Sequence, residues 1–81
     1  MKKTIIIKNS STKIDISSQY LVIKTVSQEN IIGYRHIKEL FINKLIDISM
    51  ANCLKLAKKF DLYFINQHGK ILAKVLSYEK V

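Results

Sequence analysis

The chain has 81 residues and a formal net charge of +8 at pH 7, because 14 lysine and arginine residues outnumber six aspartate and glutamate residues. A chain of this length predicts one small domain, residues 1–81, with little room for a large catalytic cleft. Since 48% of its residues are hydrophobic, the composition excludes an intrinsically disordered chain.

The first half of the chain alternates apolar and polar residues, which is the pattern of β-strands. The expected strands are, in chain order, TIIIK around Ile5–Ile7, KIDIS at 13–17, YLVIKT at 20–25 and IIGYR at 31–35. Two segments with the composition of turns, Asn9–Thr12 and Ser27–Asn30, lie between them. We expect KIDIS and YLVIKT to form a hairpin, to which IIGYR adds a third strand of the same meander. Gly33 within IIGYR indicates a bulge or a close backbone approach.

A further strand, ELFIN at 39–43, is followed by a short extended piece at 46–48 and then by a helical pattern. From Ser49 onward, the apolar residues recur at the spacing of one helical face, and they are Met50, Cys53, Leu54 and Ala57. Ser49 has the side chain of a good N-cap. Three lysines near the end of the segment suit the negative C-terminal end of a helix. We therefore expect a helix of about three turns, with Leu54 at the centre of its buried stripe.

The last two expected strands, DLYFIN at 61–66 and KILAKVL at 70–76, form a hairpin across Gln67–Gly69. Gly69 supplies the positive φ of a tight turn, so His68 is interpreted as a turn residue, with a role as a ligand as the alternative. The fold class that follows is mainly β (α+β): a small antiparallel β-meander and hairpin domain with one short helix.

Groups suited to catalysis are few and scattered. The histidines, His36 and His68, stand alone, whereas a zinc site needs several converging ligands. Cys53 falls on the expected buried face of the helix, which indicates a structural cysteine. A two-metal nuclease needs converging carboxylates, and the six in this chain are spread along its length. We expect no catalytic residue, no metal site and no cofactor in this chain alone.

The basic charge is the strongest functional signal. It attracts polyanions, of which DNA is the usual partner, although a merely solubilising surface is the alternative. Because 13 of the 14 basic residues are lysine, we expect contacts to phosphates, with little readout of base edges. The candidate DNA contacts are Lys8, Lys13, Lys55, Lys58 and Lys59. The tyrosines, Tyr20, Tyr34, Tyr63 and Tyr78, could stack on bases, but half-buried packing is the more ordinary role of a strand tyrosine.

The single cysteine excludes an internal disulfide and suits a reducing compartment. No apolar run approaches the roughly 20 residues that cross a bilayer. The segment after the N-terminal lysines holds only three isoleucines, too few for the apolar core of a secretory signal. We therefore expect a cytoplasmic protein without membrane contact.

The second half of the chain combines a strand, a capped helix and a glycine hairpin in the string HIKELFINKLIDISMANCLKLAKKFDLYFINQHGKILAKV. The defining positions are Ile37, Leu40 and Ile42 in the strand, Ile48 and Ser49 at the cap, and Leu62, Phe64, Asn66 and Gly69 in the hairpin. This pattern resembles the N-terminal β-domain of the CRISPR-associated integrase, the metal-dependent DNA endonuclease that inserts new spacers in antiviral defence. Upstream, KIDISSQYLVIKT resembles the second and third strands of that domain.

The resemblance implies a platform that helps to build a homodimer, contacts the ends of captured DNA and works with the small second adaptation protein. It places the catalytic glutamate, histidine and aspartate, with their magnesium or manganese, in a helical C-terminal domain. Nothing in residues 1–81 corresponds to that domain, so the chain alone is expected to be non-catalytic. The alternative is a stand-alone basic β module that binds nucleic acid or a partner protein. The sequence leaves open whether Val81 is a natural end.

A homodimer also follows from the strands themselves. Small β domains cover their strand edges, charge them or pair them with another chain. TIIIK and YLVIK are apolar and carry little protecting charge, so we expect a dimer that buries apolar side chains of these strands. The alternative is that both strands are internal to a sheet and that the monomer is complete.

Overall fold

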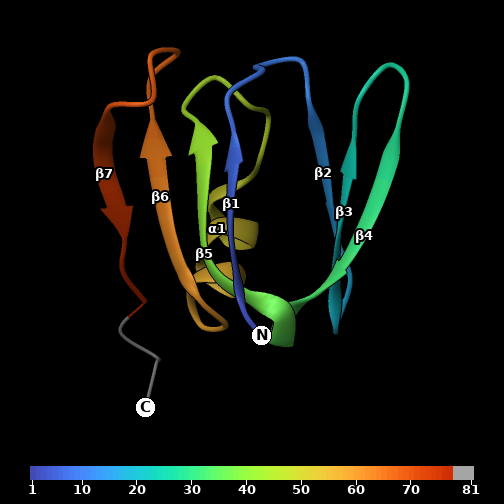
Figure 1. The fold of residues 1–81 in the computed structure, drawn as a ribbon. Helices are drawn as coiled ribbons and strands as arrows, with labels where there is room; N and C mark the ends of the chain where they lie inside the picture. Colours follow the sequence, from blue (N-terminus) through green and yellow to red (C-terminus); the bar gives the residue numbers. More distant parts are fainter. Residues whose placement is uncertain (78–81) are drawn as a thin grey trace.

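A computed structural model describes residues 1–77, which form two β-sheets and one α-helix (Figure 1). The strands before the helix are β1 (Lys3–Ile7), β2 (Lys13–Ile16), β3 (Tyr20–Lys24), β4 (Glu29–Gly33) and β5 (Ile37–Asn43). The helix α1 (Met50–Ala57) is followed by β6 (Asp61–Ile65) and β7 (Ile71–Val75), and a 3₁₀ turn, η1 (Tyr34–His36), joins β4 to β5. The expected mainly β fold with one short helix is confirmed.

The three-stranded sheet is an antiparallel meander in the order β2-β3-β4. Its register pairs Ile14 with Ile23 and Leu21 with Ile32, so the hairpin and the third strand expected from the sequence are both present. Pairing of β3 with β4 continues without a register shift to Gly33, opposite Tyr20. The expected bulge at Gly33 is therefore wrong, because the strand simply ends there and η1 begins.

The four-stranded sheet has the order β1-β5-β6-β7 and is mixed. Strands β1 and β6 both run parallel to β5, whereas β7 returns antiparallel to β6 through the expected hairpin. The two parallel pairings need long connections: β2 to β4 lie between β1 and β5 in the chain, and α1 lies between β5 and β6. Strand β5 is central, and its residues Ile37, Leu40 and Ile42 are almost completely buried.

Helix α1 begins at the expected N-cap, because the Ser49 hydroxyl accepts a hydrogen bond of 3.1 Å from the Asn52 backbone N–H. It has eight residues, so it is shorter than expected. The expected buried face is partly wrong. Cys53, Leu56 and Ala57 are buried, whereas Leu54 is 39% exposed and Met50 is 64% exposed. The buried stripe runs on to Phe60, beyond the helix, and this shift turns Leu56 rather than Leu54 toward the core.

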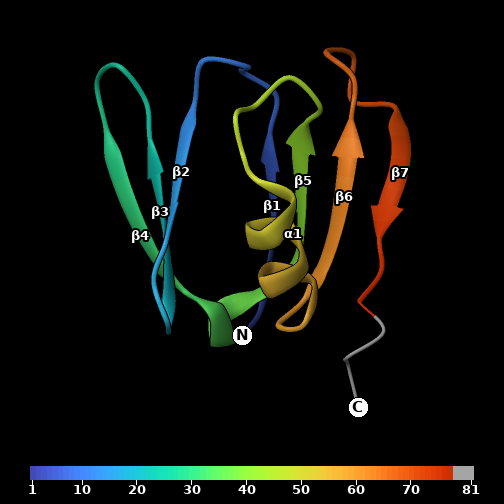
Figure 2. The ribbon, with the colours of Figure 1, turned by 180° about the vertical axis from the view of Figure 1, so that it is seen from behind.

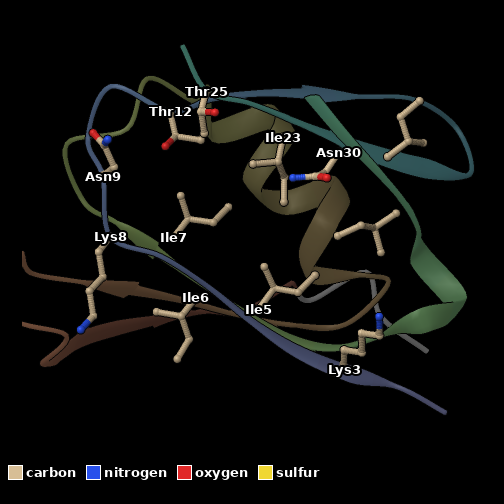
Figure 3. A pocket seen from close by; sticks show the side chains of 12 residues that line it. Lys3, Ile5, Ile6, Ile7, Lys8, Asn9, Thr12, Ile23, Thr25 and Asn30 are labelled. Atoms are coloured by element: carbon tan, nitrogen blue, oxygen red, sulfur yellow. The ribbon is translucent and has the colours of Figure 1, made fainter. Parts of the chain in front are cut away.

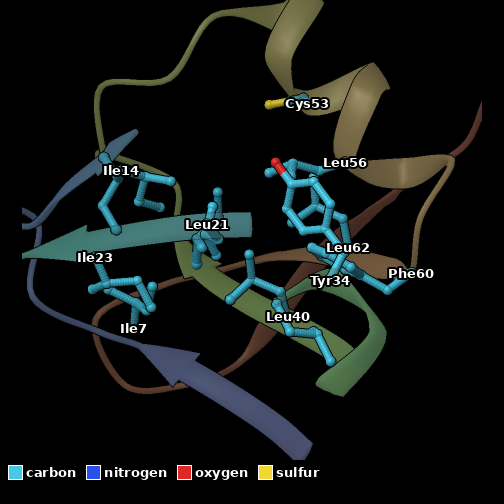
Figure 4. Packing of buried hydrophobic residues seen from close by; sticks show 13 residues of the cluster. Ile7, Ile14, Leu21, Ile23, Tyr34, Leu40, Cys53, Leu56, Phe60 and Leu62 are labelled. Atoms are coloured by element: carbon cyan, nitrogen blue, oxygen red, sulfur yellow. The ribbon is translucent and has the colours of Figure 1, made fainter. Parts of the chain in front are cut away.

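The two sheets and the helix share one hydrophobic core (Figure 4). Leu21 of the three-stranded sheet, Leu40 and Leu62 of the four-stranded sheet and Leu56 of the helix have no exposed surface. The helix covers the inner face of the four-stranded sheet, as the view from behind shows (Figure 2). No helix within residues 1–77 is long and apolar enough to cross a bilayer.

The segment 46–48 forms a loop and not the expected extended piece. Asn43 holds the start of this loop, since its side-chain Nδ2 donates to the Lys8 carbonyl at 2.7 Å and its Oδ1 accepts from the Leu45 N–H at 2.9 Å. Asn43 is buried, and both ends of its amide are satisfied. One side chain thus ties the end of β1 to the loop that leads to the helix.

Candidate nucleic-acid interface

A groove forms where three segments meet at one end of the molecule: the turn between β2 and β3, the η1 turn, and the C-terminal end of α1. Its volume is about 610 Å³, and it is lined by Ser18, Gln19, Tyr20, Gly33, Tyr34, Arg35, His36 and Lys59. A smaller hollow of about 150 Å³ shares Ser18, Tyr34 and Lys59 with it and is lined further by Ile16, Ser17, Lys55 and Lys58. We call these two adjoining hollows the basic groove.

Tyr34 holds the three segments of the basic groove together. Its hydroxyl donates a 2.6 Å hydrogen bond to the Ser17 carbonyl, and its backbone N–H donates to the Gln19 carbonyl at 3.0 Å. Its ring lies 6.0 Å from the ring of Phe60, just after the helix. Burial raises the pKa of Tyr34, although the hydrogen bond to Ser17 acts in the opposite direction. The phenol is therefore a neutral donor that fixes the groove wall.

The charges of the basic groove come from separate parts of the chain. Arg35 and His36 are exposed on η1, and the Arg35 Nε donates to His36 Nε2 at 3.3 Å. Lys55, Lys58 and Lys59 are exposed at the C-terminal end of α1, where they offset the negative end of the helix dipole. Among the described residues that line the groove, none is an aspartate or glutamate. Cations set among hydroxyl and amide groups suit the phosphates of a nucleic acid.

The structure divides the five lysines predicted as DNA contacts into two sets. Lys55, Lys58 and Lys59 line the basic groove. Lys8 follows β1 and Lys13 begins β2, so both lie beside the first loop, at the opposite end of the sheets from η1 (Figure 1). A role for Lys8 and Lys13 in DNA contact stays a prediction, and they do not extend the basic groove.

Sequence reasoning missed Arg35 and His36 as members of the site, and it named Tyr34 only among the tyrosines that could stack on bases. The available signal was the single arginine of the chain, followed by a histidine and placed directly after a strand that ends in Gly33. The sequence pattern predicts that Arg35 ends the strand IIGYR, whereas the structure puts Tyr34–His36 in a 3₁₀ turn that exposes Arg35 and His36 and buries Tyr34. The partner segments of this turn lie 14 or more residues away in the chain, so the groove has no local sequence pattern.

His68 lies in the turn of the β6–β7 hairpin, which is organised by Asn66. The Asn66 Oδ1 accepts hydrogen bonds from the backbone N–H groups of His68 at 2.9 Å and Lys70 at 3.0 Å. Gly69 has a φ of +86°, which confirms the expected positive-φ position. The interpretation of His68 as a turn residue agrees with this geometry.

The other singled-out groups have packing roles. Burial raises the pKa of the Cys53 thiol, which favours the unreactive neutral form. Tyr63 stacks on Phe41 with ring centroids 4.6 Å apart, and Tyr34 is buried, so only Tyr20 is an exposed aromatic residue in the basic groove. Tyr78 lies outside the described residues. Within residues 1–77, no three histidine, cysteine or carboxylate side chains are grouped so that they could hold a metal ion.

Comparison with known proteins identifies solved structures of the same fold. No family model matches the chain, and no curated protein is found to match it. A partial Cas6-RT-Cas1–Cas2 complex matches with a TM-score of 0.77 and 14% identity, over 98% of this chain and 24% of that one. A Cas6-RT-Cas1–Cas2 complex matches with a TM-score of 0.75 and 15% identity, over 95% of this chain and 9% of that one.

A Cas1 protein from Thermotoga maritima matches with a TM-score of 0.72 and 13% identity, over 99% of this chain and 25% of that one. At these identities the likeness shows a shared fold. The chain spans a quarter or less of the length of each of these solved structures. All three carry Cas1 in their names, so the fold expected from the resemblance in the sequence is confirmed.

Proposed function

We propose that the chain is the N-terminal β-domain of a CRISPR adaptation integrase and serves spacer acquisition as a non-catalytic platform, one domain over residues 1–81. The observation that carries the proposal is the fold likeness to Cas1 structures over 95% or more of the chain. The strand, capped helix and glycine hairpin support it from the sequence. The resemblance assigns catalysis to a helical domain, and none of the residues of this chain matches that domain.

DNA contact is the first part of this role. The basic groove gathers Arg35 with the three lysines of the helix end, and hydroxyl groups stand beside them. Such groups neutralise and orient phosphates without reading base edges. Binding is therefore weak, insensitive to sequence and steeply dependent on salt, because it is driven by the release of counterions from DNA.

The second part is self-association, for which we propose a different strand edge from those expected from the sequence. Strand β3, which contains YLVIK, is paired on both sides in the three-stranded sheet, so the expected free edge at this segment is wrong. Strand β7 is an edge of the four-stranded sheet, and Ile71, Leu72 and Leu76 on and beside it are largely exposed. We place the homodimer contact at this apolar edge, which two copies can share by antiparallel pairing.

The third part is a protein partner. Two of the solved structures with this fold are complexes in which Cas1 is named together with Cas2. We propose that the chain acts in the same kind of assembly, with the small second adaptation protein as its partner. The cytoplasm, where CRISPR DNA lies, is the compartment that this role requires.

Fluorescence anisotropy with a short labelled DNA duplex tests the DNA contact. The affinity of the chain should fall steeply between low and physiological salt. The double variant Arg35→Glu/Lys59→Glu should weaken binding at least tenfold, whereas Lys44→Glu/Lys70→Glu, with the same charge change outside the basic groove, should weaken it far less. Affinity that is insensitive to salt, or an equal loss in both double variants, contradicts the assignment of the groove.

The family assignment has a separate test in the genome. A reading frame that continues beyond Val81 into a helical domain, next to a CRISPR array and a small second adaptation gene, supports the proposal. A complete frame far from any array contradicts it and favours a stand-alone basic module. The two tests are independent, since a basic module would also bind DNA.

A further inference from the structure

A second groove separates the two sheets along β1 and β4 (Figure 3). Its volume is about 510 Å³, and its lining residues are Lys3, Ile5, Ile6, Ile7, Lys8, Asn9, Thr12, Ile23, Thr25, Asn30, Ile31 and Ile32. Within residues 1–77, β1 pairs only with β5, and β4 pairs only with β3. The groove thus runs between two edge strands, which have backbone N–H and C=O groups available for pairing. We call it the edge groove.

The edge groove is apolar along its length and basic at its ends. Six isoleucines line it, of which Ile6 and Ile31 are 58% and 64% exposed. Lys3 begins β1 and Lys8 follows its last residue, and Figure 3 shows the two lysines at opposite ends of the strand. A five-residue strand is about 17 Å long at about 3.3 Å per residue. The lysines therefore bracket a site of that length.

Within residues 1–77, no aspartate or glutamate lines the edge groove. Glu29 begins β4 beside it, but in the register of the sheet it stands opposite Lys24. Asp15, and to a smaller extent Glu29, raise the pKa of Lys24, so Glu29 acts on that lysine. Lys3 and Lys8 are the charged residues among its described lining, and the exposed Lys8 side chain lies beside Gly69 of the β6–β7 turn.

A second copy of β1 does not suit this edge. Antiparallel pairing of two copies over the whole segment from Lys3 to Lys8 would set Lys3 of one copy opposite Lys8 of the other, twice over, and like charges directly opposite each other are destabilising. A nucleic acid does not suit it either, because its floor is aliphatic, with no aromatic ring on which a base could stack. The complementary occupant is an extended peptide that is apolar in its middle and acidic at both ends.

We propose that the edge of β1 accepts such a peptide, a segment of another protein, as an added strand of the four-stranded sheet. Backbone hydrogen bonds to β1 supply affinity, alternate apolar side chains enter the edge groove, and acidic side chains reach Lys3 and Lys8. This site lies on different residues from the basic groove, and its existence does not depend on the proposed function.

The test uses a fluorescein-labelled synthetic peptide with two glutamates at the spacing of Lys3 and Lys8, enclosing alternating valine and threonine. Anisotropy measures its binding to the full chain. The double variant Lys3→Glu/Lys8→Glu should weaken binding at least tenfold and should instead bind the same peptide with lysines in place of the glutamates. Lys44→Glu/Lys70→Glu is the matched control, with the same change in net charge outside the edge groove, and should retain most of the affinity.

Two further measurements separate strand addition from other modes of binding. N-methylation of alternate peptide amides should lower the affinity at least tenfold, because it removes the donors of the new ladder. NMR should show the largest amide shifts at Thr4–Ile7. The proposal would be overturned if the N-methylated peptide bound equally well or if Lys3→Glu/Lys8→Glu kept the parent affinity. It would also be overturned if a DNA oligonucleotide displaced the peptide, or if self-association protected the β1 amides. Circular dichroism confirms that the variants, which change exposed side chains only, remain folded.

Discussion

The two edge strands of the four-stranded sheet, β1 and β7, differ in their charges and in their exposed apolar side chains. Strand β1 begins at Lys3 and is followed by Lys8, and no carboxylate of the described part of the chain lines the edge groove beside them. Strand β7 contains one lysine, Lys74, whose Nζ lies 3.5 Å from the Asp61 carboxylate and 5.5 Å from the centroid of the Tyr63 ring. The lysines at the ends of β1 suit the acidic partner that we propose, whereas the lysine within β7, Lys74, is paired within the sheet.

The two strands also differ in how much of their apolar side chains is exposed. In β1, Ile7 is buried, Ile5 is half-buried and only Ile6 is an exposed isoleucine. In β7, Ile71 is 53% exposed and Leu72 is 46% exposed. An edge with exposed apolar side chains is stabilised when it buries them against a second copy. An edge with charges at its ends is stabilised by a strand of opposite charge. In the two contacts that we propose, the placement of a few lysines therefore decides which edge pairs with a like strand.

The largest effect is expected from a variant that unfolds the shared core, because both edge strands, β1 and β7, depend on that core. Leu56→Asp places an unpaired charge among fully buried side chains, at a cost of several kcal/mol, which is comparable to the whole stability of a small domain. We expect this variant to lack a cooperative melting transition and to lose both peptide binding and self-association. Leu54→Asp, two residues away at a partly exposed position, should melt near the parent protein. Circular dichroism measures both, and a cooperative melt of Leu56→Asp within a few degrees of the parent would show that the assigned helix face is wrong.

That pair of variants also marks a limit of the sequence analysis. The N-cap at Ser49 and the helical period were visible locally, and both are confirmed. The rotation of the helix was not, because Met50, Cys53, Leu54 and Ala57 make as good a stripe as Cys53, Leu56, Ala57 and Phe60. Packing against the shared core selects the second set, and that core includes Leu21 and Leu40, which are distant from the helix in the chain.

The strand pairings likewise fall into those that the local sequence predicts and those that it does not. Hairpins of adjacent strands, β2–β3 and β6–β7, are predictable because each joins two strand-like segments that only a few residues separate. The parallel pairing of β1 with β5 joins residues about 35 positions apart, such as Ile5 and Leu40, and no local pattern encodes it. The basic groove was half predicted for this reason: its helix lysines were found, but Arg35 and His36 reach it only through the fold.

The second largest effect should separate the two edges. In antiparallel pairing of β7 with a second copy, centred on Ala73, Leu72 stands opposite Lys74 of the other copy. Leu72→Lys sets like charges opposite each other twice and should weaken the homodimer at least tenfold. Ile6→Lys, a similar change on β1, should leave the dimer intact. Light scattering on gel-filtration peaks measures the mass. A parent protein that is monomeric at about 100 micromolar would contradict the dimer, and equal loss in both variants would contradict its placement at β7.

A smaller effect should come from the turn that carries β7. Gly69 has a φ of +86°, a conformation that costs a residue with a Cβ about 1 kcal/mol or more. Gly69→Ala should therefore lower the free energy of unfolding by about 1 kcal/mol, as urea denaturation measures it. Gly33→Ala is the matched control, because Gly33 has an ordinary φ of −65° and an added Cβ would lie 3.4 Å from the His36 ring, an ordinary contact. Equal destabilisation in the two variants would show that backbone conformation is not the cause.

The smallest expected effect concerns the charge of Lys74 itself. The side chains of Asp61 and Lys74 are both 43% exposed, so solvent screens the pair and its loss should change stability by no more than about 0.5 kcal/mol. Asp61→Asn should therefore melt close to the parent protein. It leaves the Lys74 charge without its carboxylate on the β7 edge, so the homodimer should weaken by a few-fold, and more at low salt than at high salt. The corresponding change in the other sheet, Asp15→Asn, removes the 2.7 Å ion pair with Lys24 and should leave the dimer unaffected. If Asp61→Asn dimerises as the parent does at low salt, the compensation of Lys74 does not distinguish β7 from β1, and the exposed apolar side chains of β7 alone set its choice of partner.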